Sequence, residues 1–462
     1  MTRRFHIISK PLIVLIFLIC FTKVYSQNIT WYKVYNGPDN WDDAGNAICK
    51  ADGDNFFIAA TATSHGYLMK INQYGDTLFT KRIGQLVGSG QTIYSIVPDG
   101  NNNFYLTGDG SRAFVIKINI NGDVLWEKYY TPVNNYVRMN ESKLFSDNCL
   151  VSCGKKGTSQ GYIQKIDSAG NLLWSKIVDG GFSRTYCGLE EDSSGNVVVA
   201  GFDFATSHFS KYSSTGAFIY EKNIGTIMPI KMRKASNGYN IGGYNFQFLR
   251  LDTAGNFLSR HEFNDTSQYE QLYDLQMINE NKFVMCCFSY NKVSDTVRVK
   301  IVIADTSGKV LHSKILSNIS NYIKLKGIHV TPGGDILFTG FREIENTTME
   351  DIIIMRTNQY LEGPTSGINS NQISSVNSFQ LFQNYPNPFN PSTTIQFSIP
   401  KNGIVAFKVY DSIGKEVYFN SKYFNAGSHQ MEYSAENLSS GIYFYSLQFG
   451  EIVKSKKMIF VK

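Results

Sequence analysis

The sequence predicts an all-β protein with a large repetitive part followed by a small β-sandwich. Alternating aliphatic and aromatic runs broken by Gly, Asn and Asp recur throughout, and helical periodicity is absent outside the first residues. A hairpin motif recurs about every 47 residues between residues 68 and 315. A Pro- and Asn-rich stretch at 384–391 then precedes a last group of short alternating strands.

The first 26 residues have the pattern of a secretory signal peptide. Basic side chains precede ten consecutive apolar residues at 12–21, a run that is too short to span a bilayer. We predict cleavage after Ser26, so that the mature chain starts at Gln27. Lipidation of Cys20 is the alternative, but Ile19 stands where a small residue is expected. No later segment is long and apolar enough to predict a transmembrane helix.

Charge and cysteine content exclude several classes of protein. The formal net charge is +6, and four basic and no acidic side chains in residues 1–26 leave +2 for the remainder, which does not indicate nucleic-acid binding. Cys149 and Cys153 would lie about 13 Å apart on one strand, beyond disulfide reach. The adjacent Cys286 and Cys287 would point to opposite faces. We therefore expect packed free thiols, and no cysteine spacing fits a zinc site.

Six copies of the hairpin share one turn design. An Asn, Asp or Ser starts the turn and caps its own backbone, and a Gly then supplies the positive φ. An aliphatic residue and, in most copies, a large ring follow. The turn glycines are Gly75, Gly122, Gly170, Gly216, Gly255 and Gly308. The ring positions hold Phe79, Trp126, Trp174 and Tyr220, with Ser259 and His312 as weaker members.

Two further short strands precede each hairpin, as at 92–100 and 103–108. Four short strands per repeat of this length are typical of a β-propeller blade. The strand at 30–35 carries a ring but has no hairpin before it, and the strand at 352–360 has no ring-bearing strand after it. We therefore predict seven blades within residues 27–360. The N-terminal strand would close the last blade and leave no open sheet edge.

Two columns of basic residues run through the repeats. They could form a ring of positive charge for an anionic glycan, or they could protect exposed outer strands from edge-to-edge pairing, which the near-neutral charge favours. One column follows the ring position by two residues and holds Lys33, Lys81, Lys128, Lys176, Lys222 and Lys314. The other precedes the turn and holds Lys70, Lys117, Lys165, Lys211, Arg250 and Arg356.

No catalytic, cofactor or metal site is predicted. Five histidines fall at different strand positions without metal-ligand spacing, and no G-x-S-x-G, H-E-x-x-H or P-loop motif occurs. The stretch "ADGDN" at 51–55 resembles the start of a calcium loop but lacks the later acidic ligands, so we expect a turn. The histidines are His65, His208, His261, His312 and His329.

The repeats resemble secreted propeller repeats of the SBBP type and, more loosely, the repeats of pyrroloquinoline-quinone enzymes, over about residues 30–360. The resemblance implies the fold. It does not extend to the quinone chemistry, because no acidic metal cluster accompanies Cys286 and Cys287, which stand in a column filled elsewhere by Ala200 and Gly201. Five Asp-Ser/Thr-apolar triplets are similar to O-glycosylation sites of Bacteroidetes secreted proteins, although three lie at the hairpin turns. They start at residues 76, 167, 252, 295 and 411.

The C-terminal part begins with a polar, Gly/Ser/Asn-rich segment at 361–378, which we interpret as a linker. Residues 379–462 then predict a small β-sandwich. Its expected strands are 393–399, 404–410, 415–420, 429–434, 442–449 and 452–461.

The motif "NYPNPFNP", the hairpin "VYDSIGKEV", the segment "LSSGIYFY" and the Lys-rich ending occur in that order. With them, residues 379–462 resemble the type A C-terminal sorting domain of the type IX secretion system of Bacteroidetes and related phyla; an ordinary carbohydrate-binding sandwich is the alternative. The resemblance implies export through the periplasm and a β-barrel translocon of a Gram-negative outer membrane, followed by release or surface attachment. The sorting motif consists of Asn384, Tyr385, Pro386, Asn387, Pro388, Phe389, Asn390 and Pro391.

These observations predict a secreted or cell-surface propeller that acts as a non-enzymatic binding or adhesion module. A glycan or protein ligand would lie at the central channel. The alternative is a hydrolase or lyase of extracellular polysaccharide or peptide, which requires acidic or His residues that converge from several blades. A purely structural surface protein is the third possibility, because fold alone does not decide function.

Overall fold

The protein is described here by a computed structural model, and its described part is built from strands without a helix. No helix among the described residues is long and apolar enough to cross a membrane. The structure describes residues 30–35, 42–62, 65–83, 92–131, 136–179, 183–204, 206–265, 268–291, 296–316, 323–343, 349–362, 379–381, 383–384, 386–399, 402–424 and 427–462.

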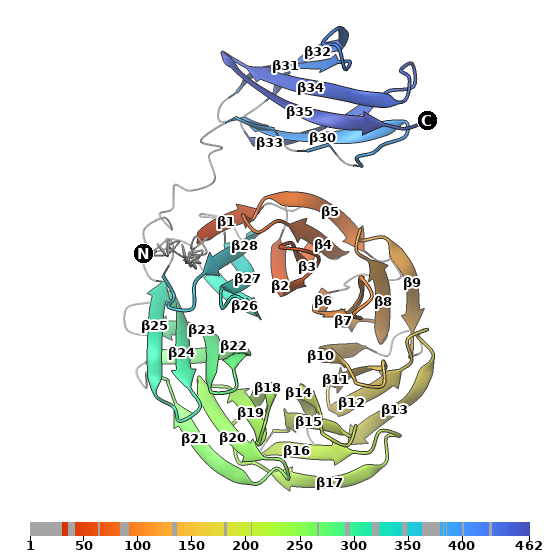
Figure 1. Cartoon of the computed structure of the whole chain (residues 1–462). Helices are drawn as coiled ribbons and strands as arrows, with labels where there is room; N and C mark the ends of the chain where they lie inside the picture. The colour runs from red at the N-terminus through yellow and green to blue at the C-terminus, as the bar shows by residue number, and fades with distance from the viewer. Residues whose placement is uncertain are drawn as a thin grey trace, which may run out of the picture.

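Strands β1 to β28 form a ring of antiparallel sheets around a central axis (Figure 1). The first half of the ring contains β1 (Trp31–Tyr35), β2 (Asp43–Lys50), β3 (Phe56–Ala62), β4 (His65–Ile71), β5 (Thr77–Ile83), β6 (Thr92–Pro98), β7 (Asn103–Gly110), β8 (Phe114–Asn119), β9 (Val124–Tyr129), β10 (Val137–Leu144), β11 (Leu150–Lys156), β12 (Gln160–Ile166) and β13 (Leu172–Asp179).

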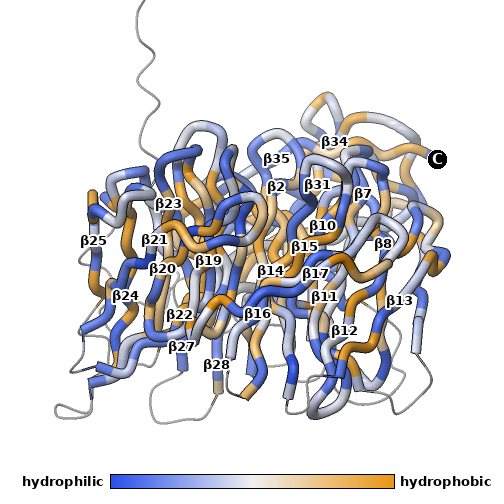
Figure 2. The backbone as a smooth tube through the Cα atoms, turned by 90° about the horizontal axis from the view of Figure 1, so that it is seen from below, coloured by the Kyte–Doolittle hydropathy of each residue, from blue (hydrophilic) through white to orange (hydrophobic). Residues whose placement is uncertain are grey.

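The second half continues in the same pattern. It contains β14 (Thr185–Glu191), β15 (Val197–Phe202), β16 (Ser207–Tyr212), β17 (Phe218–Asn223), β18 (Pro229–Ala235), β19 (Gly238–Gly243), β20 (Gln247–Asp252), β21 (Phe257–Glu262), β22 (Gln268–Asn279), β23 (Lys282–Asn291), β24 (Thr296–Asp305), β25 (Val310–Leu316), β26 (Ile323–Val330), β27 (Ile336–Glu343) and β28 (Glu350–Thr357). Hydrophobic residues follow the strands, and the turns at their ends are mostly hydrophilic (Figure 2).

The described strands pair in groups of four that run from the central axis outward. Five groups are separate sheets: β2–β5, β14–β17, β18–β21, β22–β25, and β26–β28 with β1. The groups β6–β9 and β10–β13 are joined into one sheet through Val137 opposite Gly110 and Arg138 opposite Asp109. The predicted propeller is confirmed as the fold. The blade count of seven stays a prediction, because it requires this joined sheet to be divided in two.

The ring closes through its first and last strands, as the two unpaired strand patterns predicted. Strand β1 pairs antiparallel with β28, with Trp31 opposite Arg356 and Tyr35 opposite Ile352. The side-chain hydroxyl of Tyr35 also donates to the carbonyl of Gly75 at 2.5 Å. The N-terminal strand thus covers what would otherwise be the open edge of β28.

The ring residues of the repeats pack against the turn glycines of the neighbouring sheet, which explains why both recur. A Cβ atom added at Gly75 would lie 2.8 Å from Trp31 Cζ3, and one added at Gly216 would lie 2.8 Å from Trp174 Cδ2. At Gly255 and Gly308 the contacts come from Phe209 and His261 instead of the predicted ring positions at Tyr220 and Ser259. The turn therefore needs Gly for the close approach as well as for its positive φ.

The C-terminal strands form two sheets that enclose their own core of buried Phe, Tyr, Val, Ile and Leu side chains. One sheet has the order β29-β30-β33 and the other β32-β31-β34-β35, so the predicted small sandwich is confirmed. The two-residue strand β29 was not predicted. The strands are β29 (Gln380–Leu381), β30 (Ser392–Ile399), β31 (Gly403–Tyr410), β32 (Glu416–Phe424), β33 (Gly427–Ser434), β34 (Gly441–Phe449) and β35 (Ile452–Phe460).

The last turn of the ring extends slightly beyond the predicted boundary at residue 360. The Asn358 side-chain oxygen accepts the amides of Tyr360 and Glu362, at 2.9 and 3.0 Å. Leu361 is only 4% exposed and packs in the core beside β28. Residues 361 and 362 therefore belong to the fold of the ring, which corrects the start of the predicted linker.

Candidate functional site

The innermost strands of the ring share a backbone irregularity that faces the central channel. In each group of four strands, the pairing register between the innermost strand and its neighbour shifts by one residue, at the corresponding position of each innermost strand. Such bulges re-aim side chains and are common beside functional sites. The skipped residues are Asn46, Tyr94, Asn140, Cys187, Ile230, Tyr273 and Lys326.

A cavity of about 290 Å³ lies in the channel beside these bulges. Its lining comes from β2, β6, β10, β18, β22 and β26. The lining is asymmetric: Ala47, Ser95 and Gly327 contribute little volume on one side, whereas β10 and β18 contribute long charged side chains on the other. Strand β22 adds Asp274, and β26 adds Lys326. The small residues leave the space that the charged residues face.

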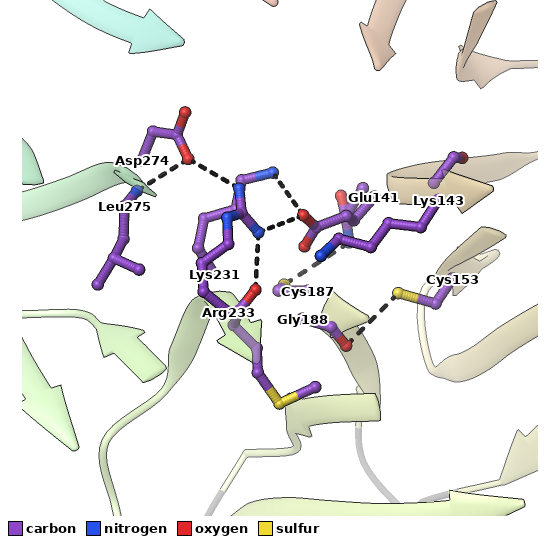
Figure 3. Close-up of polar contacts among 12 residues, drawn as sticks. Glu141, Lys143, Cys153, Cys187, Gly188, Lys231, Arg233, Asp274 and Leu275 are labelled. Carbon is purple, nitrogen blue, oxygen red and sulfur yellow. Dashed lines mark hydrogen bonds and ion pairs between the residues drawn. The ribbon is translucent and has the colours of Figure 1, made fainter. Parts of the chain in front are cut away.

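Arg233 is the centre of the charged side, and its donors are largely occupied (Figure 3). Its Nη1 donates to Glu141 Oε1 at 2.6 Å and to the Met232 carbonyl at 2.7 Å. Its Nη2 lies 3.4 Å from Asp274 Oδ1, and its Nε donates to Gln276 Oε1 at 3.1 Å. The guanidinium thus joins three innermost strands and holds the two carboxylates in place.

Glu141 keeps one carboxylate oxygen without a protein partner. The residue is 5% exposed, and its Oε2 is buried without a hydrogen bond among the described residues. Burial alone would raise the pKa of Glu141, but the positive charges of Arg233, Lys231 and Lys143 outweigh it and lower this pKa. The side chain is therefore an ionised acceptor with a free oxygen beside the cavity.

Asp274, in contrast, uses both oxygens within the protein. Its Oδ1 accepts the Leu275 amide at 2.8 Å, and its Oδ2 accepts the Ile328 amide of β26 at 2.8 Å. Burial nevertheless raises the pKa of Asp274, despite the opposing charges of Lys231 and Arg233. Asp274 therefore connects two neighbouring sheets and has little capacity left for a ligand.

Two lysines that line the cavity have no carboxylate within hydrogen-bonding distance among the described residues. Lys231 Nζ lies 3.9 Å from Glu141 Oε1, at the limit of an ion pair. Lys326 Nζ donates to Asn46 Oδ1 at 3.2 Å and lies 4.7 Å from the centre of the Phe341 ring. Burial lowers the pKa of Lys326, against the opposing charge of Glu350, and the described residues show no ion pair of its ammonium within 4.0 Å. Lys143, by comparison, is paired with Glu190.

The two predicted basic columns lie elsewhere, and their charges are used between and within the sheets. In the first column, Lys33 pairs with Asp76 and Lys81 with Asp123, both at 2.6 Å, so that each reaches the turn of the neighbouring sheet. This placement differs from both sequence interpretations, because these ammonium groups are engaged by neighbouring turns. In the second column, most members bind an Asp at the inner turn of their own sheet: Lys70 binds Asp52, Lys117 binds Asp99, Lys165 binds Asp147, Lys211 binds Asp192 and Arg356 binds Asp335.

The other residues considered from the sequence do not form a second centre. The six cysteines that the structure describes are buried and free, as predicted. The stretch at 51–55 is a turn in which Asp52 accepts from Asn55 and Lys70. His208 lies between Asp203 and Glu221, at 2.7 and 3.3 Å. Within the described ranges, no group of three or more His, Cys, Asp or Glu is placed to hold a metal ion.

Most of the sorting motif packs onto the C-terminal sandwich. Asn384 is 1% exposed; its amide donates to the Tyr445 hydroxyl at 2.8 Å and its Nδ2 donates to Thr393 Oγ1 at 3.0 Å. Asn387 Oδ1 accepts the Ile459 amide at 2.8 Å. Phe389 is buried and forms a single parallel bridge with Phe460. Residues 386–391 thus form a series of bends that leads into strand β30.

Three predicted residues lie outside the described ranges: Ser26, Gln27 and Tyr385. The prolines of the sorting motif, Pro386, Pro388 and Pro391, are exposed. The Asn387–Pro388 and Asn390–Pro391 peptide bonds are both cis.

The comparisons with known proteins address the C-terminal part directly. Residues 383–462 match the family described as the secretion system C-terminal sorting domain. The match contains the whole sorting motif and strands β30 to β35. This sorting domain of the type IX system implies export to the cell surface or the extracellular space. No curated protein matches the chain.

Several solved structures resemble the ring at low identity. BamB from Moraxella catarrhalis is 9% identical with a TM-score of 0.40, covering 68% of this chain and 99% of that chain. YCF48 bound to D1 peptide is 11% identical with a TM-score of 0.47, covering 72% and 96%. The extracellular domain of the putative hybrid two-component system BT3049 from B. thetaiotaomicron is 10% identical with a TM-score of 0.44, covering 93% and 57%.

Sequence reasoning missed the charged cavity, although a signal was present. The stretches "NESK" at 140–143 and "KMRK" at 231–234 place charged residues inside innermost strands, and "YDLQ" at 273–276 adds a further acid. Charged residues are rarely buried in a protein core, so their presence in an innermost strand indicates a role other than core packing. Their convergence could be seen only once the ring placed these strands side by side.

Proposed function

We propose that the chain is a propeller protein exported by the type IX system that binds a small polar ligand in its central channel. The observation that carries the proposal is the cavity beside the bulges, which combines a free carboxylate oxygen on Glu141 with the lysines 231 and 326. Pockets with a few convergent polar groups are typical ligand sites, and about 290 Å³ is at their lower size limit. The sorting domain supports action outside the cell.

The proposal includes the domain arrangement expected from the sequence. Residues 1–26 would be removed as a signal peptide, residues 27–360 would form the binding part, residues 361–378 would form a linker, and residues 379–462 would direct export. The sorting domain is an address rather than an activity. Its partners would be the type IX translocon and sorting machinery, with either release or surface attachment as the final step.

Binding fits the cavity better than catalysis because of how its carboxylates are used. A hydrolase with two carboxylates needs one to donate a proton and the other to act as nucleophile or base. Asp274 is held by two backbone amides and Arg233, so its oxygens are not free to act. One available carboxylate oxygen is sufficient to accept a ligand hydroxyl but not to perform this chemistry.

A hydrolase or lyase remains the second candidate for one specific reason. The pKa of Asp274 is raised by burial, whereas that of Glu141 is lowered by its cationic neighbours, against the effect of burial. Carboxylates whose environments shift their pKa values in opposite directions are common in acid–base pairs.

A glycan-array screen of the full chain and of a channel-blocked variant tests the proposal. We expect Ser95→Trp, which fills the cavity, to abolish array binding. The control Thr80→Trp adds the same ring on the exposed face of β5 and should leave binding unchanged. If Ser95→Trp bound the array as strongly as Thr80→Trp, the ligand would lie outside the channel. Release of new reducing ends from an array ligand by the wild type, but not by Ser95→Trp, would favour the enzyme.

A further inference from the structure

The charge balance of the cavity suggests which kind of ligand it takes. Four cations lie on its lining, whereas Glu141 and Asp274 are its acidic members and Glu190 pairs with Lys143 just beside it. The lining residues by themselves therefore carry four cations and two carboxylates. The charge of Glu350 also acts on Lys326, although the described residues show no ion pair between them within 4.0 Å. Arg233 is occupied by its protein partners, so the excess charge available to a ligand belongs to Lys231 and Lys326.

Lys326 is placed for a ligand rather than for the fold. It is the skipped residue of the β26 bulge, and its recorded polar partner is the neutral Asn46 side chain. A partly buried ammonium without a hydrogen-bonded carboxylate costs stability, because it loses hydration and gains little in return. An anion in the cavity would supply the missing partner through a charge-assisted hydrogen bond.

Glu141 adds a second and different requirement. Its Oε2 is buried, unpaired and beside the same cavity, so it needs a donor from the ligand. The charge of Glu141 is already compensated by Arg233 and by Lys231 and Lys143 nearby. A ligand ammonium would meet these three cations, whereas a neutral hydroxyl would not. Glu141 therefore selects a hydroxyl donor.

We propose that the channel cavity binds the carboxylate of a small sugar acid, with Lys326 and Lys231 facing the carboxylate and Glu141 Oε2 accepting a ring hydroxyl. The proposal rests on the channel being the ligand site. Recognition of an anionic glycan was one of the two interpretations of the outer basic columns, and the proposal places it at the centre of the ring instead. A volume of about 290 Å³ limits the recognised unit to about one sugar ring.

Isothermal titration calorimetry with the full chain tests this ligand class through a matched pair of probes. D-Galacturonate and D-galactose share a ring and differ in the carboxylate, and acetate keeps the carboxylate without hydroxyls. We expect galacturonate to bind at least about tenfold more tightly than either, since a charged hydrogen bond contributes about 1.5–3 kcal/mol. Equal binding of galacturonate and galactose, or no binding of galacturonate, would overturn the proposal.

Two lysine variants separate the binding role from stability. Lys326→Met should weaken galacturonate binding by about 10- to 100-fold with little change in the melting temperature, because the lost ammonium makes no ion pair within 4.0 Å among the described residues and interacts with Glu350 only at longer range. Lys324→Met is the matched control: it lies on the same strand, rests on the rings of Phe288 and Phe341, and does not line the cavity. It should leave binding unchanged. Equal affinity of wild type and Lys326→Met would refute the role of Lys326.

Glu141→Gln keeps the side-chain shape and should weaken galacturonate while leaving acetate unaffected. If this variant does not fold, as judged by circular dichroism, Lys326→Met decides the question alone.

The proposed channel function and the proposed sugar-acid ligand fail in different ways. Loss of array binding in Ser95→Trp together with no response to galacturonate leaves the channel function standing and rejects the sugar acid. Array binding that Ser95→Trp does not affect rejects both.

Discussion

At the scale of single residues, the channel shows how a charged group can be structural, functional or both. Arg233 and Asp274 have their hydrogen-bonding groups engaged by protein partners, and they connect innermost strands across the ring. Glu141 has both roles: its Oε1 accepts a hydrogen bond from Arg233, and its Oε2 has no hydrogen-bond partner among the described residues. Lys326 contributes little to the fold. The same strands thus carry the support of the site and its proposed ligand contacts.

Removing Arg233 should be strongly destabilising. Arg233→Met would leave Glu141 and Asp274 as buried carboxylates without their shared cation, and breaking a buried pair costs about 3–5 kcal/mol. Urea unfolding monitored by circular dichroism measures the loss. Lys234→Met, at an exposed position on the same strand, should change the free energy of unfolding by less than about 0.5 kcal/mol. A small loss for Arg233→Met would mean that the cluster is not part of the folding core.

Glu350 should make the stability depend on pH. Burial raises its pKa to about 7, more than Lys326 lowers it. Because the folded pKa exceeds the unfolded value of about 4.5, the folded state binds more protons between these values and its stability falls as pH rises. His329, whose pKa burial lowers to about 4, acts in the opposite direction over an overlapping range. The wild-type profile alone would therefore not isolate Glu350.

The variant Glu350→Gln isolates this contribution. Its melting temperature should fall less than that of the wild type between about pH 4.5 and 7, and it should be the more stable protein at pH 8. Glu350 is only partly buried, so solvent screening reduces the effect. Identical pH profiles for variant and wild type would show that the carboxyl titrates normally.

At the scale of elements, the unit of organisation is the contact between one sheet and the turn of the next. The ring of Trp174 lies on Gly216, its Nε1 donates to the Ser214 carbonyl at 3.0 Å, and Lys222 reaches Asn256 Oδ1 at 2.6 Å in the next turn. The ring, turn and basic columns found in the sequence are therefore parts of one repeated joint. Their recurrence reflects assembly of the ring and not a repeated ligand site.

A pair of glycine substitutions measures what this joint contributes. Gly216 and Gly100 have φ values of 83° and 81°, so Ala at either position carries the same backbone strain of about 1–2 kcal/mol. A Cβ at Gly100 meets nothing within 4 Å, whereas one at Gly216 meets Trp174 at 2.8 Å. Gly216→Ala should cost about 1–3 kcal/mol more than Gly100→Ala in thermal unfolding. Equal costs would show that the joint adapts freely.

At the scale of the whole molecule, the ring depends on a strand contributed from the far end of its sequence. Strand β1 covers β28, whose Ile352, Ile353 and Ile354 are buried. Closure also brings Gln73 within reach of both Trp31 and Arg356, whose side chains donate to its carbonyl at 2.8 and 3.0 Å. An open ring would expose an apolar sheet edge.

Deleting residues 27–35 should therefore cause the chain to self-associate. Size-exclusion chromatography with light scattering should detect oligomers, and the melting temperature should fall. Deleting residues 379–462 is the control for chain truncation: it should leave the ring monodisperse while abolishing export in a bacterium with a type IX system. A monodisperse protein after deletion of residues 27–35 would show that closure by β1 is dispensable.

The sequence by itself determined the all-β class, the repeat, the closing strand and the sorting domain, because each depends on local patterns. A turn glycine, a ring four residues later and the motif at 384–391 can be read from neighbouring positions. The same patterns identified the basic columns but not their partners, since Lys81 finds Asp123 only when two sheets pack together.

Only the tertiary structure decided where the candidate site lies. Glu141 and Arg233 are 92 residues apart, and Lys326 and Asn46 are 280 apart, yet closure of the ring places them around one cavity. The bulges that expose these side chains leave no mark in hydrophobic periodicity, because a single inserted residue shifts only the local register. The repeats encode each strand, and the closed ring alone determines which charges face each other across the channel.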